Sequence, residues 1–178
     1  MKLIKGFKKF FDNRKIDSIC KEYDITDYTI NSDGSIDVDC SVYIRFKRLT
    51  KLPLKFGRVS GDFDCSHNNL TSLEGCPGWV GRNFDCHNNN LTSLKGSPSS
   101  IEDDFVCHNN KLTTLEGGPR VVNGNFDCSS NQLTNLIGGP GWVGRNIMLV
   151  ITKLHHLKDF QMNILMIVIL AEIQFMKF

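Results

Sequence analysis

The sequence lacks an excess of charge of either sign. Its 21 lysine and arginine residues nearly balance its 19 aspartate and glutamate residues, which leaves a formal net charge of +2 at pH 7 over 178 residues. The basic residues crowd the N-terminus and thin out afterwards. Because a net charge this small gives no electrostatic reason for nucleic-acid binding, we expect no nucleic-acid partner.

Long apolar segments are also lacking. The N-terminal MKLIKGFKKFFDNRK has only short apolar pairs between lysines, unlike the continuous apolar region of a secretory signal. The most apolar stretch, residues 164–171, is far shorter than the roughly 20 residues that span a bilayer, and Asn163 and Glu172 flank it closely. We therefore expect no secretion and no membrane span, and we place the chain in a cytosol.

A disulfide framework is not indicated either. The seven cysteines are odd in number, and four of them recur at one fixed interval, at Cys65, Cys86, Cys107 and Cys128. A cytosol keeps thiols reduced, and reduced cysteine behaves as a small core residue. With 40% hydrophobic and 22% charged residues, the composition is ordinary for a chain that forms a packed core.

A period of 21 residues runs through the middle of the chain. Four copies are clean, and they contain aligned columns of phenylalanine, cysteine, asparagine, leucine, glycine, proline and valine or isoleucine. Besides the cysteines, the columns are Phe63, Phe84, Phe105, Phe126; Asn68, Asn89, Asn110, Asn131; Leu70, Leu91, Leu112, Leu133; Leu73, Leu94, Leu115, Leu136; Gly75, Gly96, Gly117, Gly138; Pro77, Pro98, Pro119, Pro140; and Val80, Ile101, Val122, Val143.

A degraded copy precedes these four. It keeps Val42, Ile44 and Leu49 but has Lys47 where the other copies have asparagine. A terminal repeat is expected to be atypical because it has a neighbour on one side only. We therefore predict a capping region over residues 1–41, five repeats over residues 42–62, 63–83, 84–104, 105–125 and 126–146, and a separate tail over residues 147–178.

Each copy reads F-x-C-x-x-N-x-L-x-x-L-x-G-x-P-x-x-V, and this motif resembles the leucine-rich repeat over residues from about 42 to 146. The strings DFDCSHNNLTSLEGCP and YTINSDGSIDVD are also similar to uncharacterised repeat proteins of bacteriophages and large viruses. The resemblance implies a solenoid fold and, for a viral protein, a place in the host cytosol. It does not imply a molecular role.

The pattern supports the same fold on physical grounds. Phenylalanine and cysteine are two residues apart, so both point to one side of a short strand, and stacked copies form a parallel sheet. Stacked asparagines can bond the backbone groups left open where the chain leaves the strand. A 21-residue period leaves little room for a helix, so the return path should be extended or turn-like. We expect a mainly β, right-handed solenoid with a parallel concave sheet and minor α content.

The N-terminal segment predicts a helix over residues from about 5 to 23, which Asp12, Asn13 and Arg14 are expected to interrupt. The following residues, 28–38, contain the turn sequence Asn-Ser-Asp-Gly and predict a hairpin. We interpret both as a cap on the first coil. The alternative is that the basic, amphipathic start contacts a membrane or nucleic acid.

The tail after Arg145 contains no further glycine or proline. It is either a capping strand or helix, or the product of a frameshift near codon 146. In a shifted reading frame, residues 151–163 can encode a further repeat, with its asparagine at position 152, 21 residues after Asn131. In that case the chain is a truncated or decaying gene product with no selected ligand, and its apolar, β-branched tail favours aggregation.

We expect no enzyme activity, cofactor or metal site. Every candidate nucleophile or acid–base group, including the four periodic cysteines, also occupies a repeat position, and inward-pointing cysteines are usually inert. Zinc sites need convergent ligands rather than a periodic column. We expect Cys76, at a turn, to be the most exposed thiol, and Trp79 and Trp142 to pack over neighbouring prolines.

The informative surface is predicted to be the concave face. Polar, mostly acidic residues alternate there with phenylalanine and cysteine, although aspartate is a poor strand former. Solenoids use such faces for binding, so we expect a monomer that recognises a basic protein segment. The alternative is that these residues bind nothing, because exposed strand positions of a soluble solenoid are polar even without a ligand. The predicted partner-binding residues are Asp62, Asp64, His67, Asp85, His87, Asp104, His108 and Asp127.

Overall fold

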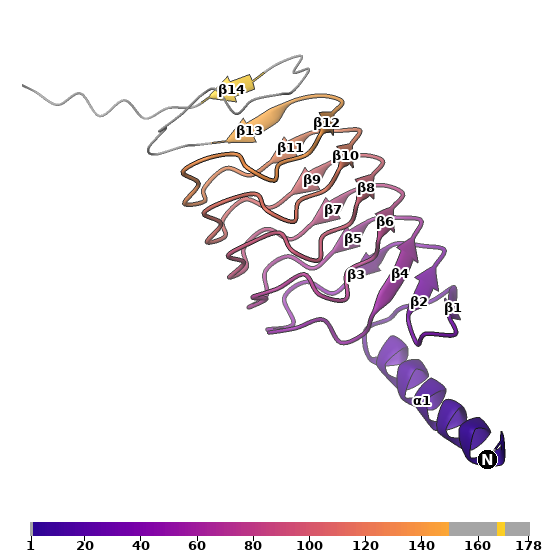
Figure 1. Cartoon of the computed structure of the whole chain (residues 1–178). Helices are drawn as coiled ribbons and strands as arrows, with labels where there is room; N and C mark the ends of the chain where they lie inside the picture. The colour runs from indigo at the N-terminus through magenta and orange to yellow at the C-terminus, as the bar shows by residue number, and fades with distance from the viewer. Residues whose placement is uncertain (1, 150–166, 170–178) are drawn as a thin grey trace, which may run out of the picture.

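The protein is a β-solenoid whose coils stack along one axis (Figure 1). The computed structural model describes residues 2–149 and 167–169. One helix precedes two seven-stranded sheets that run through the coils on opposite sides of the core. Mainly β structure, parallel sheets, an N-terminal helix and about five turns of 21 residues confirm the predicted fold class.

The phenylalanine sheet contains the Phe-x-Cys segments, in the spatial order β14-β13-β11-β9-β7-β5-β3. Its strands are β3 (Val42–Tyr43), β5 (Phe63–Asp64), β7 (Phe84–Asp85), β9 (Phe105–Val106), β11 (Phe126–Asp127), β13 (Ile147–Leu149) and β14 (Ile167–Ile169). All pairs are parallel, and from β3 to β13 residues one repeat apart face each other, as Phe63 faces Phe84 and Phe84 faces Phe105. The 21-residue period is therefore the register of the sheet.

The valine sheet lies on the return path, in the order β1-β2-β4-β6-β8-β10-β12. Its strands are β1 (Tyr28–Ile30), β2 (Ile36–Val38), β4 (Phe56–Val59), β6 (Trp79–Val80), β8 (Ser100–Ile101), β10 (Val121–Val122) and β12 (Trp142–Val143). The return path is extended, as expected. Adjacent coils also form strand pairs along it, so there is a second sheet in addition to the one predicted. Extended backbone in register with its neighbour exposes N–H and C=O groups that pair readily.

The core lies between the two sheets. Aligned phenylalanine, cysteine and leucine side chains are fully buried in each middle coil, as for Phe84, Cys86 and Leu91. The phenylalanine rings form a continuous column, with successive centroids 5.6, 5.1 and 5.3 Å apart from Phe63 to Phe126. No single repeat can bury these side chains alone, so the stack of coils is the folding unit.

The asparagine column forms the predicted ladder. The side-chain oxygen of Asn89 accepts a bond from Leu70 N of the preceding coil at 2.9 Å. Its amide donates to the carbonyl oxygens of Cys65 and Cys86, both at 3.1 Å. Each asparagine thus joins two coils where the chain leaves the phenylalanine sheet.

The N-terminal helix α1 (Lys2–Glu22) runs without interruption, so the break expected at residues 12–14 is wrong. Asp12 and Asn13 have only modestly lower helix propensity than average, Arg14 is a good helix former, and none of the three is proline or glycine. Cys20 and Ile25, near the end of the helix, are buried in the core. Among the described residues, no helix is long and apolar enough to cross a membrane.

The predicted hairpin is confirmed by antiparallel pairing of β1 with β2, in which Ile30 faces Ile36. β2 then pairs parallel with β4, so the hairpin forms the first edge of the valine sheet. At the other end, β13 continues the phenylalanine sheet in register, with Ile147 opposite Phe126. The hypotheses of a frameshift and of an aggregation-prone tail concern mostly residues 150–166 and 170–178, which lie outside the described residues. The predicted domain division stays a prediction.

Candidate functional site

The candidate site is the outer face, defined as the side chains of the phenylalanine sheet and its following turn that point away from the core. Alternation along each strand places phenylalanine and cysteine inside and the intervening residues outside. The face has three columns along the solenoid axis: Tyr43, Asp64, Asp85, Val106, Asp127, Met148; then Arg45, Ser66, His87, His108, Ser129; then Phe46, His67, Asn88, Asn109, Ser130. Within these columns, Asp64 and Ser66 are buried.

Two predicted site residues, Asp62 and Asp104, lie at the edge of this face, in a second polar ladder. Asp62 Oδ1 accepts the backbone N–H of Asn83 at 3.1 Å, and Asp104 Oδ1 accepts that of Asn125 at 2.6 Å. Burial alone would raise the pKa of Asp62, but bonds from Asn83 and the Tyr43 hydroxyl outweigh it and hold that pKa below its ordinary value. Both carboxylates therefore connect successive coils.

Asp64, Asp85 and Asp127 lie in the first column, and each fixes the turn that follows it. Their Oδ1 atoms accept the backbone N–H of the residue two positions later, at 3.0 Å in all three coils. This is an Asx turn, which explains aspartate at a strand position that it otherwise disfavours. No hydrogen bond between described residues reaches Oδ2 of Asp85 or Asp127, so this oxygen can accept a bond from another molecule.

The three predicted histidines come together in one row. His67 Nε2 is 3.0 Å from His87 Nε2, and the centroids of the His87 and His108 rings are 4.6 Å apart in a stacked arrangement. Phe46 extends the row, because its ring stacks on that of His67 at 4.2 Å. His87 Nδ1 is also 2.6 Å from Asp85 Oδ1. The row lies across four adjacent coils.

Two aromatic side chains on this face were not predicted. Phe46 is 65% exposed and Tyr43 is 52% exposed, and both belong to the degraded first copy. Arg45 lies between them in sequence, over the Tyr43 ring at 5.7 Å and 3.3 Å from Asp64 Oδ2. The outer face is thus aromatic and basic at its first coil and acidic further along. Large apolar residues filling outward positions of the degraded copy were the signal in the sequence.

The thiols offer no reactive group at this face. Burial raises the pKa of Cys107 and Cys128 well above the ordinary value of a thiol, which keeps both protonated. Cys76, expected to be the most exposed thiol, is half-buried like Cys40, whereas the other five cysteines are buried, and its sulfur contacts Cys65. Within the described residues, no group of three or more histidine, cysteine, aspartate and glutamate side chains is arranged to hold a metal ion.

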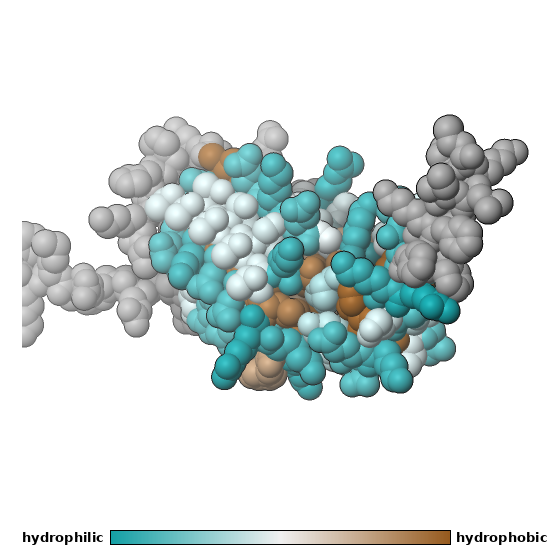
Figure 2. Space-filling view, turned by 90° about the horizontal axis from the view of Figure 1, so that it is seen from below, coloured by the Kyte–Doolittle hydropathy of each residue, from teal (hydrophilic) through white to brown (hydrophobic). Residues whose placement is uncertain are grey.

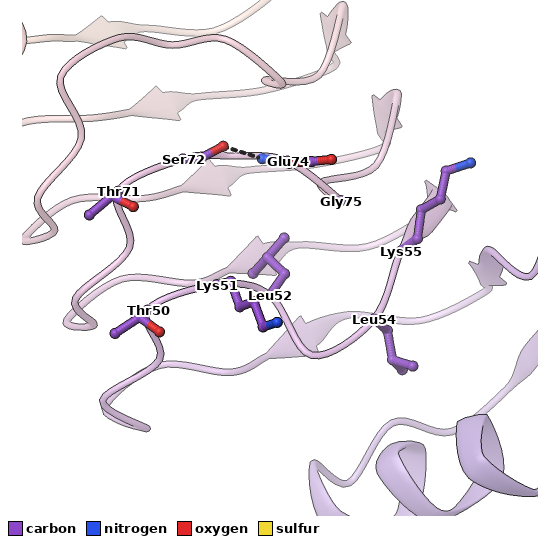
Figure 3. Close-up of a pocket in the computed structure, with 9 residues that line it drawn as sticks. All are labelled: Thr50, Lys51, Leu52, Leu54, Lys55, Thr71, Ser72, Glu74 and Gly75. Carbon is purple, nitrogen blue, oxygen red and sulfur yellow. Dashed lines mark hydrogen bonds between the residues drawn. The ribbon is translucent and has the colours of Figure 1, made fainter.

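A pocket of about 480 Å³ opens away from this face, between the first two coils. Figure 3 shows Thr71, Ser72 and Glu74 on one coil beside Thr50 and Lys51 on the other. The Ser72 hydroxyl already accepts the Glu74 backbone N–H at 3.0 Å. The lining residues include no histidine or cysteine, and the pocket contains none of the predicted site residues.

Trp79 and Trp142 belong to the valine sheet and not to the outer face. Trp79 Nε1 donates to Glu102 at 2.9 Å, and the Arg58 guanidinium lies 5.7 Å from the Trp79 ring, whereas Trp142 is 49% exposed. On the side of the molecule shown in Figure 2, hydrophilic and near-neutral residues predominate, and hydrophobic ones are confined to small areas between them.

Family models, curated proteins and solved structures were each compared with the chain, and none of the three comparisons finds a significant match.

Proposed function

We propose that the protein is a non-catalytic recognition module that binds a protein partner through the outer face. The observation that carries this proposal is the row of aspartates whose Oδ1 atoms are used within the fold while Oδ2 stays available, at Asp85 and Asp127. A basic segment of the partner is the matching chemistry, because arginine and lysine donate strong, charge-assisted hydrogen bonds to carboxylates.

Preorganisation supports the proposal. Each of these carboxylates is held by a backbone bond, so little conformational freedom is lost when a partner binds. Parallel strands about 4.8 Å apart place the first column, from Tyr43 to Met148, along roughly 24 Å. That length suits an interface of ordinary size, and the exposed rings of Tyr43 and Phe46 supply the kind of aromatic anchor that dominates binding energy.

The cellular setting and the family are also part of the proposal. All seven cysteines are free thiols, which suits a reducing compartment such as a cytosol. The ladder of asparagines at the end of each strand suits a relative of the leucine-rich-repeat proteins, including the viral ones that the sequence resembles. We further propose that the unbound chain is monomeric.

The test compares two double variants in binding to a partner captured with the full chain. Asp85→Asn with Asp127→Asn removes two charges from the outer face, while the amide oxygen can still accept the turn N–H. Glu74→Gln with Glu116→Gln removes two charges from exposed positions away from that face and serves as the matched control. We expect the first pair to weaken binding about tenfold or more and the control pair to leave it unchanged.

Equal affinity in both double variants would contradict the proposed binding face. Recognition of a basic segment would be refuted by a different pattern. In that pattern, Tyr43→Ala and Phe46→Ala abolish binding, while both double variants and added salt leave it unchanged. A specific partner is one that excess free chain displaces from the immobilised chain. If no such partner is recovered, the alternative of a truncated product without a selected ligand would be favoured.

A further inference from the structure

Two imidazole rings from adjacent coils, those of His67 and His87, meet edge to face on the outer face, with centroids 4.6 Å apart and ring planes at 79°. We propose that His67 and His87 form a binding site for a divalent transition-metal ion such as Zn²⁺, with Asp85 as the residue that orients His87. Histidine is the commonest ligand for such ions through a neutral ring nitrogen. This inference does not depend on the proposed protein partner.

The separation of the two Nε2 atoms suits a shared metal. They are 3.0 Å apart. Two ring nitrogens bound at roughly 2.0–2.1 Å to one tetrahedral Zn²⁺ lie about 3.3 Å apart, so the rings need to separate only by about 0.3 Å. Without metal, one hydrogen lies between the two nitrogens, since two lone pairs or two N–H groups would repel at this distance.

The supporting contacts orient both rings. Asp85 Oδ1 lies 2.6 Å from His87 Nδ1, which places the hydrogen on Nδ1 and directs the Nε2 lone pair toward His67. A carboxylate behind a ligating histidine is the usual arrangement around protein-bound metals. His67 is held by stacking with Phe46, and the Asn88 amide nitrogen lies 3.3 Å from both His67 Nδ1 and His67 Nε2.

The repeat itself sets this pair apart. The second column has serine in place of histidine at Ser66 and Ser129. In the third column, His67 is the single histidine. A histidine of the third column therefore meets one of the second column in the next coil once among the described coils, at His67 and His87. The expectation of no metal site considered ligands within one column, whereas these two come from neighbouring columns.

The site is open to solvent, since the His87 side chain is 18% exposed and that of Asp85 is 27% exposed. Two protein ligands leave further coordination positions for water or for a group from another molecule. This accords with the lack of any convergent group of three among the described residues. His108 stacks on His87 with its ring at 27° and serves as a neighbouring histidine outside the pair.

The experiment titrates Zn²⁺ alone into the full chain carrying His155→Gln and His156→Gln, which removes the two adjacent histidines of the tail. Long-range ¹H–¹⁵N spectra then report the ring nitrogens of the three remaining histidines. We expect His67 and His87 to shift together and saturate at one Zn²⁺ per chain. His67→Gln or His87→Gln should weaken binding about tenfold or more, Asp85→Asn about 10- to 100-fold, and His108→Gln only slightly.

Circular dichroism of each variant establishes that the fold is retained, and Asp85→Asn keeps the turn bond because its amide oxygen can still accept the His87 N–H. Three results would overturn the proposal. The first is absence of a shift up to about 1 mM Zn²⁺. The second is a shift of one ring without the other, and the third is binding that His67→Gln and His87→Gln leave unchanged, which would place the metal on the thiols.

Discussion

Replacing Asn89 with alanine is expected to lower the free energy of unfolding by about 2 to 6 kcal/mol. The change removes the acceptor that, among the described residues, the buried backbone N–H of Leu70 uses. An orphaned buried donor costs about 1–3 kcal/mol, and the lost bonds to the carbonyl oxygens of Cys65 and Cys86 add about 0.5–1.5 kcal/mol each. Those carbonyls are not orphaned, because Asn68 still donates to Cys65 O and Asn110 to Cys86 O.

The matched control is Asn90→Ala, one residue further along the same turn. The Asn90 side chain makes no hydrogen bond with any described residue, and its backbone N–H, which bonds Leu70 O at 2.9 Å, is retained. Its cost should stay within about 0.5 kcal/mol. Urea unfolding followed by both circular dichroism and tryptophan fluorescence measures the difference, and coincident transitions establish that one free energy describes each variant. Equal midpoints for the two variants would refute the ladder as a main source of stability.

Three further predictions concern the core and the turns. Phe105→Ala should cost about 3–5 kcal/mol in urea unfolding, since its fully buried ring lies in the middle of the stacked column. Burial raises the pKa of Cys107 and Cys128, so as the pH rises the thiols ionise first in the unfolded chain. The contribution of these two thiols to the free energy of unfolding should therefore be complete below about pH 9 and decline above it. The double variant Cys107→Ala with Cys128→Ala should show a smaller decline. Gly96→Ala should lower the melting temperature more than Gly34→Ala, although both glycines have positive φ. A Cβ at Gly96 would lie 2.8 Å from the backbone of the preceding coil, whereas a Cβ at Gly34 would have no atom within 4 Å. Equal melting temperatures of the two variants would contradict this prediction.

The sequence predicted the part of the fold that repetition determines. Aligned columns such as Phe63 to Phe126 specify the period, the register and the buried side, because stacked coils must place identical residues opposite one another. The second sheet was missed because its repeated strands, such as Val121–Val122, contribute a single aligned apolar column and so show no alternation, whereas each phenylalanine strand is followed by a second buried column of cysteine. Helix α1 was predicted with a break because local propensity at residues 12–14 was given too much weight.

The candidate site was harder to predict because its residues act across coils. The spacing of Asp62 and Asn83 does not show that one side chain accepts the backbone N–H of the other. The contact between His67 and His87 joins two columns, 20 residues apart rather than 21, so a search for one exact period passes over it. Tertiary contacts of this kind are set by the stacking of coils and have no local signature.

The most direct test of the account is the footprint of a captured partner on the isotopically labelled full chain. If the outer face is the binding surface, bound partner should perturb the signals of Asp85, His87 and Asp127 and leave Trp79 and Trp142, on the valine sheet, unchanged. Perturbation confined to the two tryptophans, with the aspartates and His87 unaffected, would contradict it.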